Sequence, residues 1–328
     1  MSDNVQVSII CTAYNHEKYI RQCLDGFVMQ KGVSFEIIIH DDASTDGTAN
    51  IIREYEAKYP NLFKPIYQTE NQHSKHIPLL ISSFINPLIT GKYVALCEGD
   101  DYWTDPYKLK KQYDVLENNP NCFMCGHKVN VVKENGDDIG YTCPRNDIKS
   151  SILPKGYICM NYDNAKYIHT SSFFFKANYY KSFYRNPPQF RLVAPVGDIP
   201  LLLYFNTVGN IIYINEVMSN YRFLSIGSWS YRNANDPQKE KRRRETDKKM
   251  HQMFIEYCNY TEHKYDDCFR KIIENLSKSE FWYCINNKDY KSLFKEFKYS
   301  ELKKFGLDNK AMLKMICYIF ILKFIKKD

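Results

Sequence analysis

The sequence predicts an α/β fold: a mostly parallel sheet flanked by helices, with a helical C-terminal extension. Short runs of apolar and β-branched residues alternate with segments of helical periodicity in the first third of the chain. From Pro237 onward, aromatic and apolar residues recur at helical spacing among polar ones. The 328 residues, 44% hydrophobic and 25% charged, are enough for about two structural units and exclude disordered or collagen-like chains.

The sheet of the first third is expected from strands at residues 5–11, 35–40, 65–68 and 92–97. We expect a first helix from Tyr19 to Val28, with Asn15 as its cap, and a second helix that contains Ile52. A third helix is expected at 79–89, ended by Gly91. Strands that alternate with helices imply right-handed crossovers and therefore parallel pairing.

The middle of the chain is less regular. A helix is expected to stop before Pro120, and strand-like runs follow at 122–132, 168–175 and 210–223. We place a domain change near Gly227. The expected domains are residues 1–226, with halves 1–105 and 106–226, and a helical region 227–328 with a basic apolar tail.

The net charge of +7 comes from 45 basic and 38 acidic residues. It is concentrated at 239–249 and in the Lys-rich C-terminus, which indicates an anionic surface as partner. The 11 cysteines are scattered and no signal peptide precedes them, so we expect free thiols in the cytoplasm. No apolar run reaches the ~18 residues of a membrane-spanning helix.

Three strands are expected to end in polar residues at one edge of the sheet: 12–16, 41–42 and 98–101. The last group places three carboxylates within four residues, and these would repel one another unless a cation neutralised them. Oxygen ligands of this kind suit Mg²⁺ or Mn²⁺. The alternative is a solvated loop before Asp105 and Pro106, which would cap the next helix.

Asp42 is one of three aspartates in residues 41–46, more than a single helix cap needs. A carboxylate here could instead accept the N3–H of a uracil while Tyr14 packs against the base. Cys122 and Cys125 have metal-ligand spacing with His127 nearby, but a second ligand pair is lacking, so we interpret them as core residues.

The sequences TAYNH (12–16), DDASTDGT (41–48) and EGDDYW (98–103) occur in order at strand ends. This combination resembles the family-2 glycosyltransferases of the GT-A fold, clearly over roughly residues 5–120 and moderately to about 225. The resemblance implies transfer of a sugar from a nucleotide diphosphate to a hydroxyl acceptor, with inversion at the anomeric carbon.

The resemblance also assigns residues. It implies that Asp100 is the metal-coordinating carboxylate and that the cofactor is Mn²⁺ or Mg²⁺. Glu98 replaces the first Asp of the family's Asp-any-Asp motif, which leaves open whether it contacts the ribose or the metal. The implied nucleotide-binding residues are Thr12, Ala13, Tyr14, Asp42, Glu98 and Gly99.

A general base is implied downstream, in an acidic residue that opens a helix. Asp198 in VGDIPL (196–201) fits, and its alternative role is an ordinary helix N-cap with Pro200 in the first turn. The two roles are compatible. Further candidate contacts to substrate or diphosphate are Asp101, Trp103, His169 and Arg222, the last beside a loop (225–229) that family members close over the diphosphate. The alternatives are a structural histidine and a surface arginine.

The expected protein is a metal-dependent transferase that uses a UDP-sugar. Its expected acceptor is a saccharide or lipid-linked oligosaccharide of a capsule or lipopolysaccharide O-antigen. We expect it on the inner face of a bacterial membrane, because apolar residues and lysines share the tail 310–327. The tail could instead pack on the protein or form a homodimer.

Other classes of function fit less well. The arginines 242–244 accompany no nucleic-acid recognition module, so no nucleic-acid partner is expected. A sugar-nucleotide nucleotidyltransferase would need a Gly-rich basic loop, which 12–20 lacks. A non-catalytic carbohydrate-binding or assembly module remains the alternative.

Overall fold

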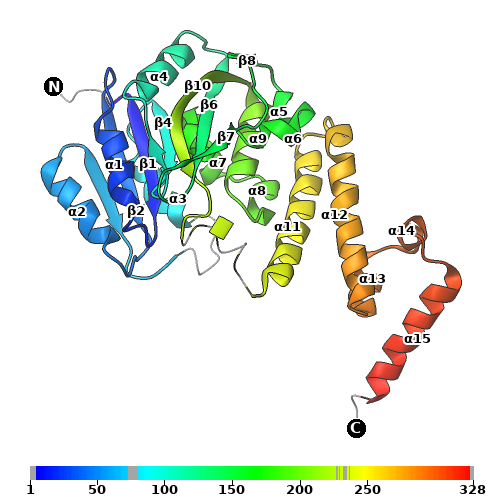
Figure 1. The fold of residues 1–328 in the computed structure, drawn as a ribbon. Helices are drawn as coiled ribbons and strands as arrows, with labels where there is room; N and C mark the ends of the chain where they lie inside the picture. The colour runs from blue at the N-terminus through cyan, green and yellow to red at the C-terminus, as the bar shows by residue number, and fades with distance from the viewer. Residues whose placement is uncertain are drawn as a thin grey trace. The chain divides into compact units, whose positions relative to one another are not determined.

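The structure, a computed structural model, describes residues 5–72, 80–226, 228, 230, 231, 235 and 237–325, without the side chains of 80–82 and 318–325. The chain divides into two compact units, Met1–Lys239 and Glu240–Asp328. Figure 1 shows a sheet with helices around it in the first unit and helices in the second.

The sheet follows the order β3-β2-β1-β4-β9-β6-β10-β5, with β7 paired to β6 and β8 to β10. Strands β3, β2, β1 and β4 are mutually parallel, as are β6 and β10, whereas β9 and β5 pair antiparallel with their neighbours. The predicted mostly parallel sheet is therefore confirmed. The strands are β1 (Val7–Ala13), β2 (Phe35–Asp41), β3 (Phe63–Tyr67), β4 (Tyr93–Glu98), β5 (Tyr102–Trp103), β6 (Cys122–Val132), β7 (Asp138–Cys143), β8 (Ser151–Leu153), β9 (Phe174–Lys176) and β10 (Asn210–Arg222).

Helices flank this sheet (Figure 1). Strands β1, β2 and β4 are mostly apolar and almost fully buried, as expected where both faces of a sheet are covered. The helices of this unit include α1 (Ile20–Val28), α2 (Thr48–Lys58), α3 (Leu80–Ile85), η2 (Asn86–Leu88), α4 (Lys108–Glu117), α5 (Tyr157–Met160), α6 (Tyr162–Ala165), η3 (Thr170–Ser172), α7 (Ala177–Arg185), α8 (Gln189–Val193) and α9 (Asp198–Val208).

Two sequence predictions were wrong in this unit. Asn15 is not the cap of α1, because it lies in the left-handed region (φ 57°) and its Oδ1 accepts the Thr45 N–H at 2.8 Å. The run 168–175 is not one strand: His169 caps the 3₁₀ turn η3, and only β9 pairs in the sheet. In both places a contact with a distant or local polar group overrides the apolar pattern.

The second unit is made of α11 (Lys239–Tyr260), α12 (Asp266–Asn286), α13 (Tyr290–Glu296), α14 (Tyr299–Lys304) and α15 (Asn309–Ile325). Phe281, Leu293 and Met312 are among its buried core residues. Arg244 of the basic run pairs with the buried Glu280 through Nε–Oε2 (2.8 Å) and Nη2–Oε1 (2.5 Å) contacts. Within the described residues, every helix is too short or too polar to cross a membrane.

Candidate active site at the carboxyl ends of the strands

The pairing register of the sheet brings three strand ends side by side. Thr12 lies opposite Glu98 of β4, and Ala13 lies opposite Asp41 of β2. The Gly99 N–H donates to Thr12 O and the Asp42 N–H to Ala13 O, both at 2.9 Å. Parallel strands therefore place the predicted nucleotide-binding residues along one edge.

The loops after β1 and β2 hold each other through reciprocal hydrogen bonds, which we call the β1–β2 clasp. The Asn15 N–H donates to Ser44 Oγ (2.9 Å), the Glu17 N–H to Asp46 Oδ2 (3.1 Å), and the Gly47 N–H to Glu17 Oε2 (2.9 Å). These bonds join the two loops directly after the carboxyl ends of β1 and β2.

Asp42 and Tyr14 lie beside this clasp. Asp42 is buried, and its Oδ1 accepts the Gln72 N–H at 2.7 Å. Tyr14 is 36% exposed, so its ring is accessible to a planar ligand. The two residues thus combine a fixed carboxylate with an open aromatic face, as the predicted base-binding role requires.

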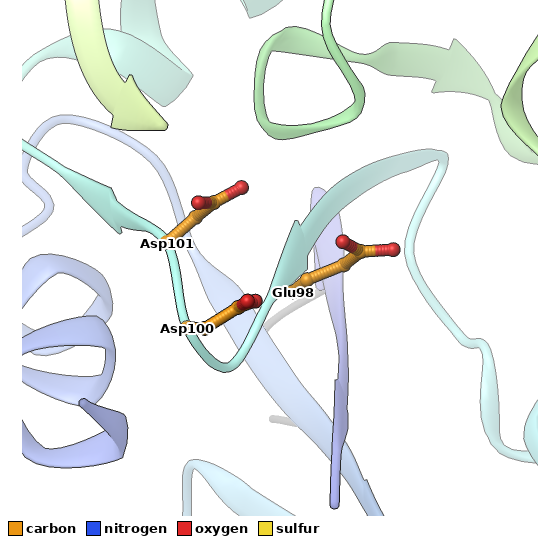
Figure 2. Close-up of side chains that lie close together, drawn as sticks. All are labelled: Glu98, Asp100 and Asp101. Carbon is orange, nitrogen blue, oxygen red and sulfur yellow. The ribbon is translucent and has the colours of Figure 1, made fainter. Parts of the chain in front are cut away.

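Glu98, Asp100 and Asp101 form an acidic cluster on the turn between β4 and β5 (Figure 2). One oxygen from each carboxylate lies within 4.8 Å of the others. Desolvation, followed by the charges of Asp100 and Asp198, raises the pKa of Glu98 to about 8. Desolvation and the charges of its neighbours, Asp100 first, also raise the pKa of Asp101 well above its usual range.

This acidic cluster fits a divalent cation. Asp101 is 1% exposed, and its Oδ2 has no hydrogen-bond partner among the described residues. Buried polar atoms are normally satisfied, so an unsatisfied carboxylate oxygen among carboxylates indicates a missing positive partner. Hard oxygen donors of this kind suit Mg²⁺ or Mn²⁺.

Residues from the end of β10 hold the cluster in place. Ser225 Oγ donates to Asp100 Oδ2 at 2.8 Å, and the Arg222 N–H donates to Asp101 Oδ1 at 2.9 Å. The Arg222 guanidinium donates to Asp100 O at 2.6 Å and to Gln22 Oε1. Arg222 is 3% exposed and holds the backbone of the acidic turn; the diphosphate contact that the resemblance implies for it stays a prediction.

Sequence reasoning did not identify the support given by Ser225 and Gln22. Ser225 appeared there only as part of an expected loop, and no pattern links it to a turn 125 residues earlier. Two other residues of that loop, Gly227 and Trp229, lie outside the described residues.

Asp198 opens α9, as expected, but the N-cap is Gly197 and Asp198 is the first residue of the helix; Asp198 is exposed to solvent. Desolvation by the surrounding protein raises its pKa, while the backbone N–H groups of the helix start and the charge of Arg191 oppose the rise. Its own charge contributes to the raised pKa of Glu98, so the two carboxylates lie within electrostatic range of each other. Arg191, which sequence reasoning missed, is buried on α8.

His169 and Trp103 lie on either side of the same turn. His169 Nδ1 lies 3.8 Å from Asp101 Oδ2, and desolvation lowers the pKa of His169 to about 4. Trp103 is 2% exposed, and its Nε1 donates to Ser171 O at 3.1 Å. Trp103 thus supports the η3 turn through this hydrogen bond, and its buried side chain is not placed to contact a substrate.

Cys122 and Cys125 lie buried on β6 as free thiols. Among the described residues, Glu98, Asp100 and Asp101 make up the one cluster with metal-ligating geometry.

The chain is similar to several known proteins. It is 36% identical over 234 residues to the uncharacterized protein Rv1520 of Mycobacterium tuberculosis, covering 68% of this chain and 60% of that protein. It is 33% identical over 110 residues to the putative teichuronic acid biosynthesis glycosyltransferase TuaG of Bacillus subtilis, covering 34% and 41%. The chain therefore spans about 60% of the length of this mycobacterial relative.

Two solved structures share the fold. S. aureus TarS 1-349 in complex with UDP-GlcNAc superposes with a TM-score of 0.52 at 16% identity, over 84% of this chain and 81% of that one. The mannosyltransferase PcManGT from Pyrobaculum calidifontis, in complex with GDP-Man and Mn²⁺, superposes with a TM-score of 0.52 at 15% identity, over 87% and 76%.

Residues 8–182, more than half of the chain, match the family model described as glycosyl transferase family 2. This match covers β1 to β9, and with them the clasped loops and the acidic cluster. The chain therefore belongs to glycosyl transferase family 2 and has the GT-A fold.

Proposed function

We propose that this chain transfers a sugar, with inversion, from a UDP-sugar to a hydroxyl of a lipid-linked or oligosaccharide acceptor. The observation that carries the proposal is the acidic cluster at the end of β4, and the charge of Asp198 acts on Glu98 of that cluster. The UDP-GlcNAc complex of TarS supports a nucleotide-sugar donor, and the name of TuaG supports a surface polysaccharide such as a capsule or O-antigen as product. We assign this activity to residues 1–226 and regard 227–328 as a helical extension.

The nucleotide would lie along the β1–β2 clasp. Asp42 would accept from the base and Tyr14 would pack on it, while Thr12, Ala13 and Gly99 present backbone at the strand ends. Gly99 has no side chain at the position where His16 packs, so no Cβ projects from this part of the sheet edge.

Asp100, with Glu98 and Asp101, would hold Mn²⁺ or Mg²⁺. When bound, the ion would supply positive charge for the diphosphate leaving group. The Mn²⁺ in the PcManGT complex supports this assignment.

Asp198 would act as the general base. As the acceptor oxygen forms its bond to the anomeric carbon, the bond from that carbon to the diphosphate oxygen breaks, and the acceptor proton passes to Asp198. No covalent bond forms between protein and sugar, which is why inversion is expected. Its place at the start of α9, exposed to solvent, leaves the Asp198 carboxylate accessible to an acceptor hydroxyl.

Two substitutions test this division of roles. Asp100→Ala should abolish metal-dependent UDP binding, whereas Asp198→Asn should leave UDP affinity nearly unchanged and lower transfer by at least 100-fold. Calorimetry with UDP and Mn²⁺ and a UDP-release assay over a panel of UDP-sugars provide the two measurements. An equal loss of UDP affinity in both variants would contradict the proposal, and wild-type protein that releases no UDP would favour a non-catalytic module.

We also propose that the chain is cytoplasmic and associates with the anionic inner surface of the membrane through α15. The lysines of this helix would contact lipid headgroups while its exposed apolar residues, including Leu313 and Ile316, enter the interface. Lys326 and Lys327 of the same tail lie outside the described residues.

A further inference from the structure

Contacts from three elements fix the His169 ring. Its Nδ1 lies 3.3 Å from Ser171 N and 3.0 Å from Ser171 Oγ, which in turn lies 3.0 Å from Ser219 Oγ of β10. The imidazole also lies over the Tyr221 ring, with centroids 4.2 Å apart and planes at 31°. The Nε1–H of Trp103 donates to the carbonyl oxygen of Ser171, which fixes the turn that Ser171 belongs to. The imidazole therefore has one defined orientation.

The contact with Ser171 also fixes where the proton of the neutral ring resides. A backbone N–H can only donate, so Nδ1 accepts and the proton lies on Nε2. No hydrogen bond joins Nε2 to any residue in the described part of the chain. His169 thus presents a fixed N–H donor that the fold itself does not use.

The charges around the imidazole determine which kind of ligand group can accept the Nε2–H. Asp101 Oδ2 lies 3.8 Å from Nδ1, and the charge of Asp100 also acts on the ring. These carboxylates disfavour a second anion at this point unless a cation accompanies it. A hydroxyl group is neutral, accepts an N–H and lies close to carboxylates without repulsion.

We propose that His169 is a specificity-determining residue whose Nε2–H donates to a hydroxyl of the donor sugar. This inference rests on the proposed function, because it requires a nucleotide sugar at the acidic cluster. His169 would then have two separable roles: Nδ1 caps the η3 turn and Nε2 recognises the sugar.

The two roles can be separated with His169→Asn. The Asn Oδ1 takes the place of Nδ1 as acceptor for the Ser171 N–H, since Asn is a strong cap, but no donor remains at the Nε2 position. His169→Gln is the matched variant, because its amide places an N–H donor near the Nε2 position. Both variants and wild type are titrated calorimetrically with UDP and with UDP-N-acetylglucosamine in Mn²⁺, and their thermal unfolding is recorded.

We expect His169→Asn to keep the wild-type melting temperature and UDP affinity, and to bind UDP-N-acetylglucosamine about fivefold to tenfold more weakly, as the loss of one hydrogen bond predicts. His169→Gln should recover part of that affinity. If His169→Asn binds both ligands like wild type, His169 is only a cap and the inference is wrong. An equal loss for UDP would place the contact on the diphosphate and would also overturn it. If wild type binds neither ligand, the proposed function itself fails, and the inference with it.

Discussion

At the scale of single residues, one hydroxyl fixes the most important carboxylate of the site. Ser225 Oγ donates a hydrogen bond to Asp100 Oδ2. This contact from a distant part of the chain fixes the orientation of the carboxylate, and with it the direction of the other Asp100 oxygen. Such outer hydrogen bonds orient metal ligands and typically change metal affinity by 10- to 100-fold when removed.

We therefore predict that Ser225→Ala lowers the affinity for Mn²⁺ in the presence of UDP by about tenfold. The reason is that Asp100 loses the contact that restricts its rotation. Electron paramagnetic resonance of free Mn²⁺ provides the measurement. Ser228→Ala is the control, because Ser228 Oγ contacts Ser230 and not the cluster. Equal Mn²⁺ affinity in wild type and Ser225→Ala would show that Asp100 needs no such support.

The burial of Lys108 predicts how the free energy of unfolding depends on pH. It is fully buried, its Nζ lies 4.0 Å from the Trp103 ring centroid and 2.8 Å from Gln112 Oε1, and desolvation lowers its pKa to about 7. Between pH 7 and the ordinary lysine value of 10.5, the unfolded chain binds more protons at this residue than the folded chain. The contribution of Lys108 to the free energy of unfolding therefore rises with pH across this window.

Lys108→Met should remove that pH dependence. We expect the stability of the variant relative to wild type to be greatest at pH 6 and to fall by a few kcal/mol by pH 10. Urea unfolding across this range measures the difference. Lys110→Met, which changes a half-exposed lysine of the same helix, should show no comparable trend. A constant difference between Lys108→Met and wild type would mean that Lys108 stays charged in the folded protein.

At the scale of elements, the turn between β4 and β5 depends on Gly99. A Cβ at this position would lie 2.8 Å from His16 Nδ1, 2.9 Å from Ile20 Cδ1 and 3.2 Å from Ala13 Cβ. His16 and Ile20 are themselves buried and have little room to move. The middle residue of the acidic motif is thus small because the start of α1 packs against it.

Gly99→Ala should destabilise the protein by ~1–3 kcal/mol through overpacking and weaken Mn²⁺ binding by shifting the acidic turn. Urea unfolding and Mn²⁺ titration measure the two effects. Gly197→Ala is a matched control, because a Cβ there meets no atom within 4 Å. Unfolding of Gly99→Ala at the wild-type urea concentration would contradict this account.

The elements differ in how well the sequence predicts them. Strands such as β2 and β4 were predictable because they are buried on both faces and their apolar runs are uninterrupted. The start of α1 and the η3 turn were not, because Asn15 and His169 are placed by hydrogen bonds to Thr45 and Ser171 that no periodicity reveals. Polar residues that bond the backbone can override local propensity in this way.

At the scale of the whole molecule, the sequence predicts where the site residues gather but not how they are supported. The order of polar groups at strand ends placed Thr12, Asp42 and Asp100 on one edge, because parallel pairing requires it. The support of the acidic cluster from β10 depends on contacts across more than 120 residues, and these follow only from the folded chain.

The proposed membrane contact is tested by removing the C-terminal part of α15 together with the residues that follow it. Met312 belongs to the buried core of the helical unit, so we propose deleting residues 316–328 and keeping Met312. The full chain should co-sediment with vesicles containing phosphatidylglycerol, and the shortened chain should remain in the supernatant. Vesicles of phosphatidylcholine alone serve as the control. Equal sedimentation of the two chains would show that the tail is no anchor.

The β1–β2 clasp has a consequence for how ligands are received. Because Asn15, Glu17 and Gly47 already hold the two loops together, the entropy of ordering them is lost when the chain folds and not when a nucleotide arrives. Even a fragment as small as uridine should therefore bind to loops that are already ordered. Without a metal, uridine monophosphate should bind no more tightly than uridine, because the acidic cluster repels the added phosphate.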